Sequence, residues 1–235
     1  MSEVQINDLE FLKETDKFID GDFIEKAYQV YLKREPDNEG RKAYLEFLSI
    51  QGGSREKVIE TIRESKEFIS KIFDYTKYPL RLNLGCGFDI RSGYLNVDLH
   101  DFHHPDLVAD IRVLDMLPSD YYEEIIAQDC LEHLPRYDTL PALKEWSRLL
   151  KKGGILQLRV PNVVGLVDII KAESSVETQE KLIQCLFGTQ AYNGDYHYTS
   201  FTKILLEHYL KEASLFIENI YDKDNWLFDV TSRKK

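Results

Sequence analysis

The chain has 235 residues, with 30 Lys and Arg against 41 Asp and Glu and a formal net charge of −11. This acidic balance argues against a nucleic-acid backbone as the main partner. No apolar stretch approaches the roughly 18 residues that span a bilayer, and no signal peptide is recognised. The three cysteines are odd in number and lack Cys-x-x-Cys spacing, so reduced thiols in a cytoplasmic protein are expected.

The N-terminal third predicts a small all-α domain. Apolar residues recur at helical spacing over 18–32 and again over 43–48. A third run covers 58–72, and Ser54 stands before it as a good N-cap. Three helices are therefore expected in this part of the chain.

A domain boundary is expected at Tyr78 and Pro79, because the residue before a proline is biased out of helical conformation. This assigns residues 1–77 to a helical module and 78–235 to a second, larger domain. The length of the chain suits such a division, with ample core in the larger part.

The helical module carries a motif that resembles the phycobilisome-linker-like helical domains of unknown function, which occur attached to enzymes of surface glycans and to secreted proteins. The resemblance implies no chemistry. We expect a module for packing, or for contact with a second copy or a protein partner, rather than for direct substrate binding. The motif consists of Tyr28, Leu32, Arg34, Pro36, Asp37, Gly40, Ser54, Arg55, Ser65, Glu67 and Phe68.

Residues 82–98 contain the most informative pattern, an apolar strand, a Gly-Cys-Gly turn and a second strand that ends on Asp98. Gly85 and Gly87 let the backbone turn sharply and approach a ligand closely. A carboxylate at the end of the next strand can accept both hydroxyls of a ribose. Ile90 replaces the third glycine of the dinucleotide fingerprint, and the acid comes sooner than its usual place about 20 residues on. A nucleotide-like cofactor without a dinucleotide pyrophosphate is expected.

Three later segments extend this pattern in chain order. Residues 108–111 predict a third short strand ending on an acid, and an apolar run at 125–127 leads into Gln-Asp-Cys-Leu-Glu-His-Leu. Residues 149–162 predict a helix end, a Gly-Gly turn and a strand stopped by proline. Together the four motifs resemble the S-adenosylmethionine-dependent class I methyltransferases, particularly the small-molecule branch, over residues 80–231. The resemblance implies an α/β fold with a Rossmann-like, seven-stranded sheet whose last strand is antiparallel.

The same resemblance implies S-adenosylmethionine as the cofactor and suggests its contacts. The turn after the first strand is expected to hold the methionine end, and the acid after the second strand the ribose. Residues after the third strand are expected at the adenine, and the end of the fourth strand closes the site. The cofactor residues so implied are Asn83, Gly85, Cys86, Gly87, Asp98, Leu99, Asp110, Ile111 and Gln128.

The chain beyond the fifth strand is longer than a plain crossover needs. Helical patterns at 164–171 and 176–187 precede a polar, aromatic and turn-rich segment, 188–201, that suits a lid over a substrate pocket. This segment resembles the Gly-Gln…Asp-x-His…Phe segment of predicted methyltransferases from polysaccharide gene clusters. The substrate-binding residues proposed within it are Gln190, Tyr192, Asp195 and Tyr198.

Methyl transfer is an in-line displacement, so positioning and desolvation are the main contributions of the protein. A hydroxyl acceptor also benefits from a base that titrates near neutral pH. His197 in the lid and His133 after the fourth strand compete for this role; substrate binding and a structural hydrogen bond are their respective alternatives. Asp129 could orient the acceptor or a histidine, or act as a helix N-cap. No metal site is expected, because adjacent histidines such as His103 and His104 rarely face one ion.

These patterns predict an S-adenosylmethionine-dependent methyltransferase with a helical appendage. The expected reaction is O-methylation of a sugar, a nucleotide sugar or a glycan precursor, as in polysaccharide biosynthesis. An N- or carboxyl-methyltransferase of a small metabolite would need no base and stays an alternative. A non-catalytic scaffolding protein with a cofactor fold is a further alternative, against which the intact Gly85, Gly87 and Asp98 weigh.

Overall fold

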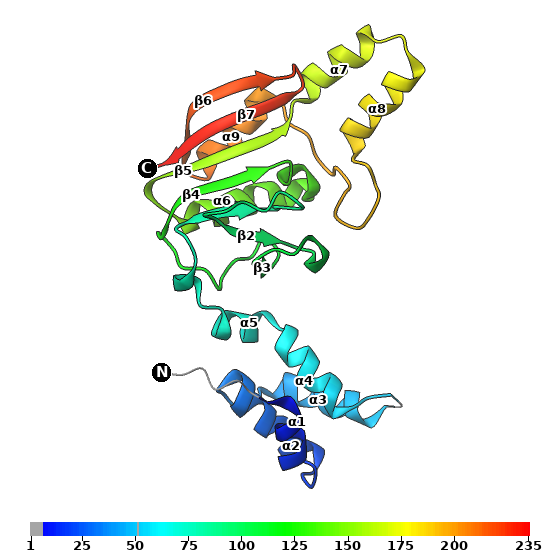
Figure 1. The fold of residues 1–235 in the computed structure, drawn as a ribbon, viewed down its shortest axis with the longest axis vertical. Coiled ribbons are helices and arrows are strands. Elements are labelled where there is room, and N and C mark those ends of the chain that lie inside the picture. The colour runs from blue at the N-terminus through cyan, green and yellow to red at the C-terminus, as the bar shows by residue number, and fades with distance from the viewer. Residues whose placement is uncertain (1–6, 51) are drawn as a thin grey trace. The chain divides into compact units, whose positions relative to one another are not determined.

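The computed structural model describes residues 7–50 and 52–235 (Figure 1). The chain divides into two compact units, Met1–Asp74 and Tyr75–Lys235, each with its own core. The first unit is helical and the second contains the sheet. Among the described residues, no helix is long and apolar enough to cross a membrane.

Short amphipathic helices build the described part of the N-terminal unit. A π-helical turn, Tyr28–Leu32, continues the second of them and ends at Lys33 in the left-handed conformation. Aromatic and branched side chains from the helices pack into one cluster that includes Phe11, Phe23 and Tyr31. The helices are α1 (Asp8–Glu14), α2 (Asp20–Ala27), α3 (Asn38–Ser49), α4 (Arg55–Glu64) and α5 (Lys66–Ile72).

The helix expected from Ser54 onward is two helices, α4 and α5. Ser54 caps α4 as predicted, since its hydroxyl accepts a hydrogen bond from the Lys57 amide at 3.3 Å. Ser65 then leaves helical conformation, and its hydroxyl accepts from the Phe68 amide at 3.2 Å to start α5. A serine hydroxyl competes with the helical backbone for its amides, which explains the break inside an otherwise periodic pattern.

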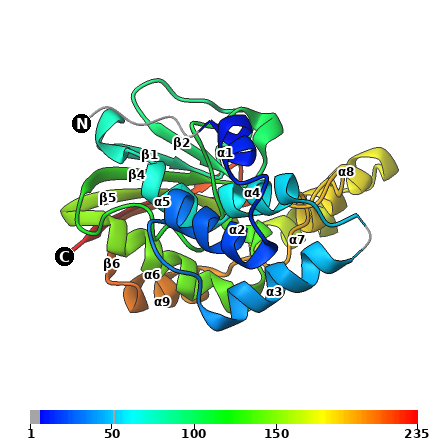
Figure 2. The same ribbon diagram turned by 90° about the horizontal axis from the view of Figure 1, so that it is seen from below.

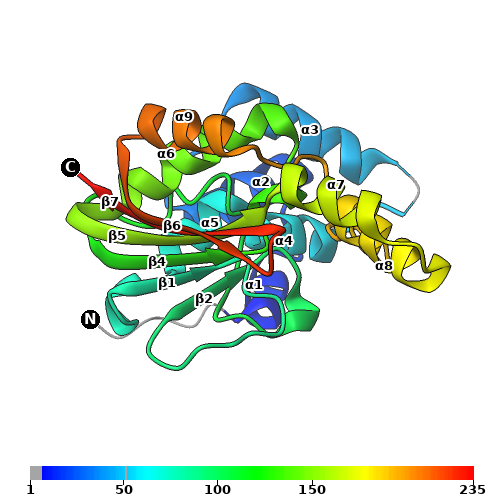
Figure 3. The ribbon, with the colours of Figure 1, turned by 90° about the horizontal axis from the view of Figure 1, so that it is seen from above.

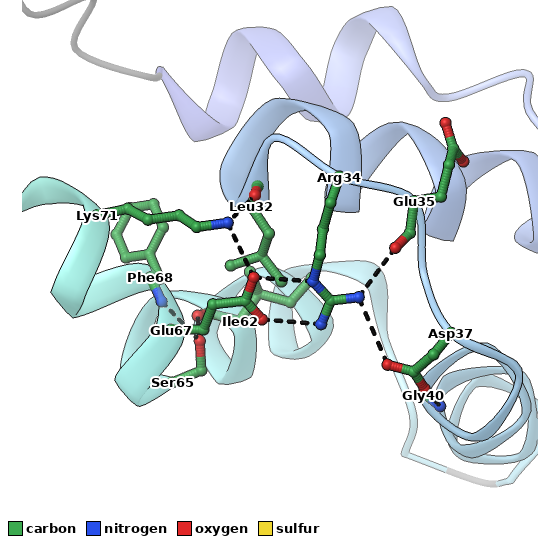
Figure 4. A network of polar contacts seen from close by, with 10 residues as sticks. All are labelled: Leu32, Arg34, Glu35, Asp37, Gly40, Ile62, Ser65, Glu67, Phe68 and Lys71. Carbon is green, nitrogen blue, oxygen red and sulfur yellow. Dashed lines mark hydrogen bonds and ion pairs between the residues drawn. The ribbon is translucent and has the colours of Figure 1, made fainter. Parts of the chain in front are cut away.

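Several residues of the N-terminal motif form polar bonds that close this unit (Figure 4). Arg34 donates two parallel hydrogen bonds to the Glu67 carboxylate, Nε to Oε1 and Nη2 to Oε2, both at 2.8 Å. Asp37 caps α3 by accepting from the Gly40 amide at 2.7 Å. A side chain at Gly40 would collide with the hydroxyl of Tyr28. These motif residues are therefore explained by the folding of the unit.

The second unit contains a seven-stranded sheet with the order β3-β2-β1-β4-β5-β7-β6. Neighbouring strands from β3 to β5 are parallel, and β7 runs antiparallel between β5 and β6. The predicted seven-stranded sheet with an antiparallel last strand is confirmed. The strands are β1 (Arg81–Leu84), β2 (Leu95–Asp98), β3 (Leu107–Val108), β4 (Tyr122–Gln128), β5 (Leu150–Pro161), β6 (Leu215–Lys223) and β7 (Leu227–Lys234).

Two elements differ from the sequence-based expectation. The third strand ends at Val108, because the Asp110 carboxylate accepts from the Arg112 amide at 2.9 Å and makes a turn of residues expected in the strand. The Gly-Gly pair does not separate a helix from a strand; it lies inside β5, where the register with β4 shifts. Gly153 has a φ of +79°, which allows the local irregularity.

Helices α6 (Thr139–Leu149) and α9 (Lys203–Glu212) contact each other and lie on one face of the sheet (Figure 3). Helices α7 (Val163–Ala172) and α8 (Val176–Phe187) form a hairpin that projects beyond the sheet (Figure 2). The chain returns from this hairpin as segment 188–201, which the sequence predicts as a lid. The inner strands β1 and β2 are nearly fully buried. Because β1, β2 and β4 run parallel, their carboxyl ends meet at one edge of the sheet.

Candidate active site

A cavity of about 380 Å³ lies at the carboxyl ends of these parallel strands. Its volume falls in the range of small-molecule sites, and its position is the usual one for ligands in open α/β sheets. Turns after β1, β2, β3 and β4 and the lid segment all contribute to its wall. The predicted site residues that line it are Gly85, Gly87, Asp98, Leu99, Asp110, Ile111, Asp129, His133, Tyr192 and Tyr198.

The turn after β1 requires its two glycines. Gly85 and Gly87 have φ angles of +59° and +49°, which side chains rarely adopt. A Cβ at Gly85 would collide with the side chain of Cys130, whereas a Cβ at Gly87 would meet nothing within 4 Å. Gly87 therefore leaves free space at the cavity wall, into which a ligand can approach the backbone. This backbone fits the close contact that a nucleotide-like cofactor needs.

Asp98 joins two turns of the cavity wall. Its Oδ2 accepts from the Gly87 amide at 2.8 Å, and its Oδ1 accepts from the His100 amide at 2.9 Å. Oδ1 also lies 2.8 Å from Nδ1 of the buried His103, which donates to it. The carboxylate is thus fixed in orientation at the cavity, and Oδ2 keeps a lone pair for a further donor.

The acid expected at the adenine is held by a cation. Arg112 donates to both carboxylate oxygens of Asp110, with Nη2 at 2.7 Å from Oδ2. Its Nη1 donates to Asp138 at 2.6 Å. Asp110, Ile111 and Arg112 all line the cavity. The turn after β3 therefore contributes a carboxylate, an apolar side chain and a guanidinium to the cavity wall.

Two of the predicted cofactor residues point their polar groups elsewhere. The Asn83 amide donates to the Asp89 carbonyl at 2.7 Å and to Asn96 Oδ1 at 3.0 Å, inside the turn it stabilises. Gln128 accepts from Arg91 at 2.9 Å. Neither residue lines the cavity, and neither does the buried Cys86. The cofactor roles that the sequence assigns to these three residues stay predictions.

The lid segment is attached to the cavity wall at two places. On one side, Nε2 of His100 lies 2.6 Å from the Asn193 carbonyl. On the other, the Tyr198 amide donates to the Glu132 carbonyl at 2.9 Å. Tyr192 and Tyr198 reach the cavity, whereas Gln190, Asp195 and His197 do not line it. Asp195 instead accepts from the Thr189 hydroxyl and the Ala191 amide within the lid.

The two candidate bases lie together. The rings of His133 and His197 have centroids 4.8 Å apart and an interplanar angle of 76°. Burial lowers the pKa of His133, against hydrogen bonds with backbone groups that raise it. Burial and the neighbouring His133 lower the pKa of His197. Both rings are therefore neutral at pH 7, as a general base requires.

Asp129 directly follows β4 in an unusual conformation. Its φ is +54°, and both carboxylate oxygens accept from Nε of Arg159, at 2.8 and 2.9 Å. The short helix that follows has no side-chain cap, so the alternative role of Asp129 as an N-cap is wrong. Arg159 fixes the carboxylate at the cavity wall, where strained backbone is typical of functional sites.

Several residues at the cavity were given no site role from the sequence. His100, His103 and Arg112 line the cavity, and Glu132 lies behind His133 with only 1% of its surface exposed. Burial raises the pKa of Glu132 to about 8. The sequence offers one signal for the two histidines, their place directly after the acidic strand end at Asp98, but none for the burial of Glu132.

Comparison with protein families assigns the two units separately. Residues 5–72 match the model described as a domain of unknown function, DUF4214. Residues 77–158, which carry the glycine turn and Asp98, match the model described as a methyltransferase domain. The C-terminal unit contains a methyltransferase domain. Its cofactor is S-adenosylmethionine, in agreement with the sequence-based prediction. No curated protein matches the chain.

Solved structures of methyltransferases resemble the chain at low identity. An S-adenosylmethionine-dependent methyltransferase from Methanosarcina mazei is 15% identical, with a TM-score of 0.49, over 66% of this chain and 91% of that one. A putative one from Listeria monocytogenes is 14% identical, with a TM-score of 0.47, over 71% and 96%. The 1,6-didemethyltoxoflavin-N1-methyltransferase of Burkholderia thailandensis, solved with S-adenosylhomocysteine, is 15% identical, with a TM-score of 0.45, over 86% and 92%. At these levels the acceptors of those enzymes say nothing about the acceptor of this methyltransferase.

Proposed function

We propose that the methyltransferase unit methylates a hydroxyl group of a sugar, a nucleotide sugar or a glycan precursor. The observation that carries this proposal is the pair of half-buried, neutral histidines, His133 and His197, at the cavity. A neutral imidazole can take the proton of a hydroxyl as the oxygen attacks. Acceptors that are already nucleophilic have no such need. The preference for a sugar comes from the resemblance of the lid to methyltransferases of polysaccharide gene clusters.

In this proposal the wall of the cavity divides into a cofactor side and an acceptor side. Bound S-adenosylmethionine supplies a methyl group on a positively charged sulfur. Asp98 accepts hydrogen bonds from the ribose through the lone pair left on Oδ2, and the open space at Gly87 accommodates the cofactor backbone. Leu99 and Ile111 contact the adenine, beside Asp110. These assignments agree with the order of the strand ends along the cavity edge.

On the acceptor side, the lid provides the rim. Tyr192 and Tyr198 line the cavity as partly exposed aromatic side chains with hydroxyl groups. Gln190 and Asp195 hold the turn of the lid and contact an acceptor that extends beyond the cavity. Asp129, fixed by Arg159, orients the acceptor hydroxyl toward the histidine pair. Exclusion of water by the lid favours the displacement.

Two wider features follow from the sequence-based predictions. The three cysteines are free, which supports a reducing, cytoplasmic place of action. The helical module matches a domain of unknown function, and we assign it to contact with a second copy or with a protein partner.

A methyl-transfer screen with labelled S-adenosylmethionine against nucleotide sugars, free sugars and small metabolites tests the reaction. For a hydroxyl acceptor, His197→Ala is expected to lower turnover by roughly 10²- to 10⁴-fold. The affinity for S-adenosylhomocysteine should stay unchanged, because His197 does not line the cavity. The plot of rate against pH should show an ionisation below 6.5 that the variant lacks, since burial lowers the pKa of both histidines.

The control is His208→Ala, an exposed histidine on α9 that should leave turnover unchanged. If His133→Ala loses activity while His197→Ala keeps it, the base is His133. If both variants keep full turnover, a histidine base is ruled out, and the alternative of an amine or carboxylate acceptor gains.

A further inference from the structure

Three metal-ligating side chains converge beside the cavity. Glu132, His133 and His197 each offer one ligand atom, and these atoms all lie within 4.8 Å of one another. Glu132 and His133 belong to the short 3-10 helix Leu131–His133 that follows β4. His197 comes from the lid, whose backbone donates to the Glu132 carbonyl through the amides of Tyr198 and Thr199. The cluster is thus held together by main-chain bonds between the two segments.

The two imidazoles are oriented so that each has a lone pair available. Nδ1 of His133 lies 3.1 Å from the Tyr196 carbonyl, which can only accept, and the backbone of Asp129 also acts on this ring; with the proton on Nδ1, the lone pair of the neutral ring is on Nε2. His197 forms a hydrogen bond with the backbone of Cys185, while its Nδ1 is buried without a partner. That hydrogen bond therefore belongs to Nε2, and the lone pair is on Nδ1. Backbone carbonyls orient metal-binding histidines in this way.

The third group is a buried carboxyl with one unpartnered oxygen. Glu132 is 1% exposed, and its Oε2 has no hydrogen-bond partner within the described residues. A buried polar group without a partner is costly, and a buried carboxylate much more so. The nearest guanidinium, that of Arg159, is already paired with Asp129. One ligand atom from each of the three side chains thus lies within 4.8 Å of the others, and a cation between them would give each a partner.

We propose that Glu132, His133 and His197 bind one divalent first-row transition-metal ion, for which Zn²⁺ is the best match. Two imidazoles and one carboxylate are the ligand set of catalytic zinc sites, in which a fourth position stays open. His133 lines the cavity, so the open position faces it. Asp129 and Asp195 act electrostatically on both rings and favour a cation at this point. Ligand bonds of about 2.0–2.2 Å require the three atoms to draw closer together on binding.

The ion would change how an acceptor is activated. Binding of the ion does not depend on the proposed methyl transfer. Its effect on acceptor activation does rest on that proposed function. With both imidazoles occupied as ligands, an acceptor hydroxyl in the fourth position would have its pKa lowered by the ion. The hydroxyl proton then goes to water in the cavity as the oxygen–methyl bond forms and the sulfur–methyl bond breaks. An imidazole base is no longer needed.

The test uses the full chain, freed of metal with a chelator and then titrated with Zn²⁺ or Co²⁺ alone. We expect one ion per chain by elemental analysis, a tetrahedral Co²⁺ absorption spectrum, and a rise in the unfolding temperature with Zn²⁺. Glu132→Gln, His133→Ala and His197→Ala should each weaken binding by at least about 100-fold. His197→Cys should retain binding and add a thiolate-to-Co²⁺ charge-transfer band, which a purely structural role of His197 would not produce.

The matched control is His208→Ala, which should bind the ion like the unaltered chain because His208 is exposed on α9. The inference is overturned if the chain binds no ion, or if the three ligand variants bind as tightly as the control, which would mark an adventitious ion only. Circular dichroism identifies a variant that has not folded. In that case the test relies on the metal binding and the Co²⁺ spectrum of His197→Cys. Calorimetry with S-adenosylhomocysteine separates the two ideas. A chain that binds this ligand but binds no ion overturns the metal site and leaves the methyltransferase proposal standing.

Discussion

At the scale of single residues, Asp98 connects the sequence pattern to the cavity most directly. It ends β2, and its carboxylate accepts from both the glycine turn and the following turn. Its position beside Gly87 could be predicted because a strand, a turn and a strand end are local in sequence. The position of His103, which donates to the same carboxylate, could not be predicted from the sequence. Its burial depends on the aromatic side chains packed around it, among them Phe88 and Phe102.

The variant Asp98→Asn tests the ribose assignment. It keeps the shape of the side chain but removes the charge that strengthens each hydrogen bond, so affinity for S-adenosylhomocysteine should fall by at least about tenfold. Isothermal titration calorimetry measures the change. Asp101→Asn, an exposed acid in the next turn, is the matched control and should bind normally. Equal dissociation constants for Asp98→Asn and the control would refute the assignment.

The histidine pair shows the limit of prediction for the site. His133 and His197 are far apart in sequence, and they were singled out as competitors for one role. The structure brings their rings together and adds the buried Glu132 behind them. That grouping depends on the path of the lid back to β4, which no local pattern encodes. Residue type was thus enough to predict the two histidines as candidate bases. Their proximity to each other follows only from the tertiary structure.

At the scale of elements, the periodic patterns predicted which segments form helices and strands, and local polar bonds moved their ends. Ser65 divides one expected helix into two, and the Asp110 carboxylate ends β3 early. Gly153 converts an expected turn into an irregularity within β5. In each case one side chain or one glycine replaces part of the regular backbone hydrogen-bond pattern. The spacing of apolar residues in the sequence does not indicate such a local change.

The bond between Arg34 and Glu67 ties α5 to the chain after α2 and predicts a pH dependence (Figure 4). Arg34 lowers the pKa of Glu67 from an ordinary value near 4.5 to about 2. Because the folded-state pKa is depressed, the stabilisation is present above pH 4.5 and is lost as pH falls toward 2. Glu67→Gln should therefore increase hydrogen exchange in α5 at pH 6, and the difference from the unaltered chain should shrink below pH 4.

Glu64→Gln, on the exposed side of α4, is the control for this measurement and should exchange like the unaltered chain at every pH. Comparison at equal pH cancels the intrinsic dependence of exchange on pH. Both groups are partly exposed, so a modest effect is expected, of the order of an exposed ion pair. If the difference in hydrogen exchange between Glu67→Gln and the unaltered chain persists unchanged at pH 3, the charge of Glu67 does not stabilise α5.

At the scale of the whole molecule, two units with separate cores correspond to two separate family matches. Every residue of the cavity wall belongs to Tyr75–Lys235. The sequence predicted two domains because the helical period gives way to short strands with a proline between them. It placed the division after residue 77, whereas the contacts divide the chain after Asp74.

A chain shortened to begin at Tyr75 should therefore bind S-adenosylhomocysteine with the affinity of the full chain. Calorimetry on both proteins gives the comparison, with circular dichroism to confirm that the shorter one is folded. A folded but non-binding protein would show that the division into domains is wrong. Normal binding with lost turnover, or with a changed oligomeric state, would assign the helical module to the acceptor site or to assembly.

The double attachment of the lid has a kinetic consequence. One attachment, at His100, adjoins the carboxylate assigned to the ribose; the other, at Glu132 and His133, adjoins the histidines assigned to the acceptor. A lid that is bonded at both places cannot release one side of the site and keep the other fully enclosed. Entry and exit of the two ligands then become linked events, and the lifetime of the enclosed complex depends on whichever attachment breaks last.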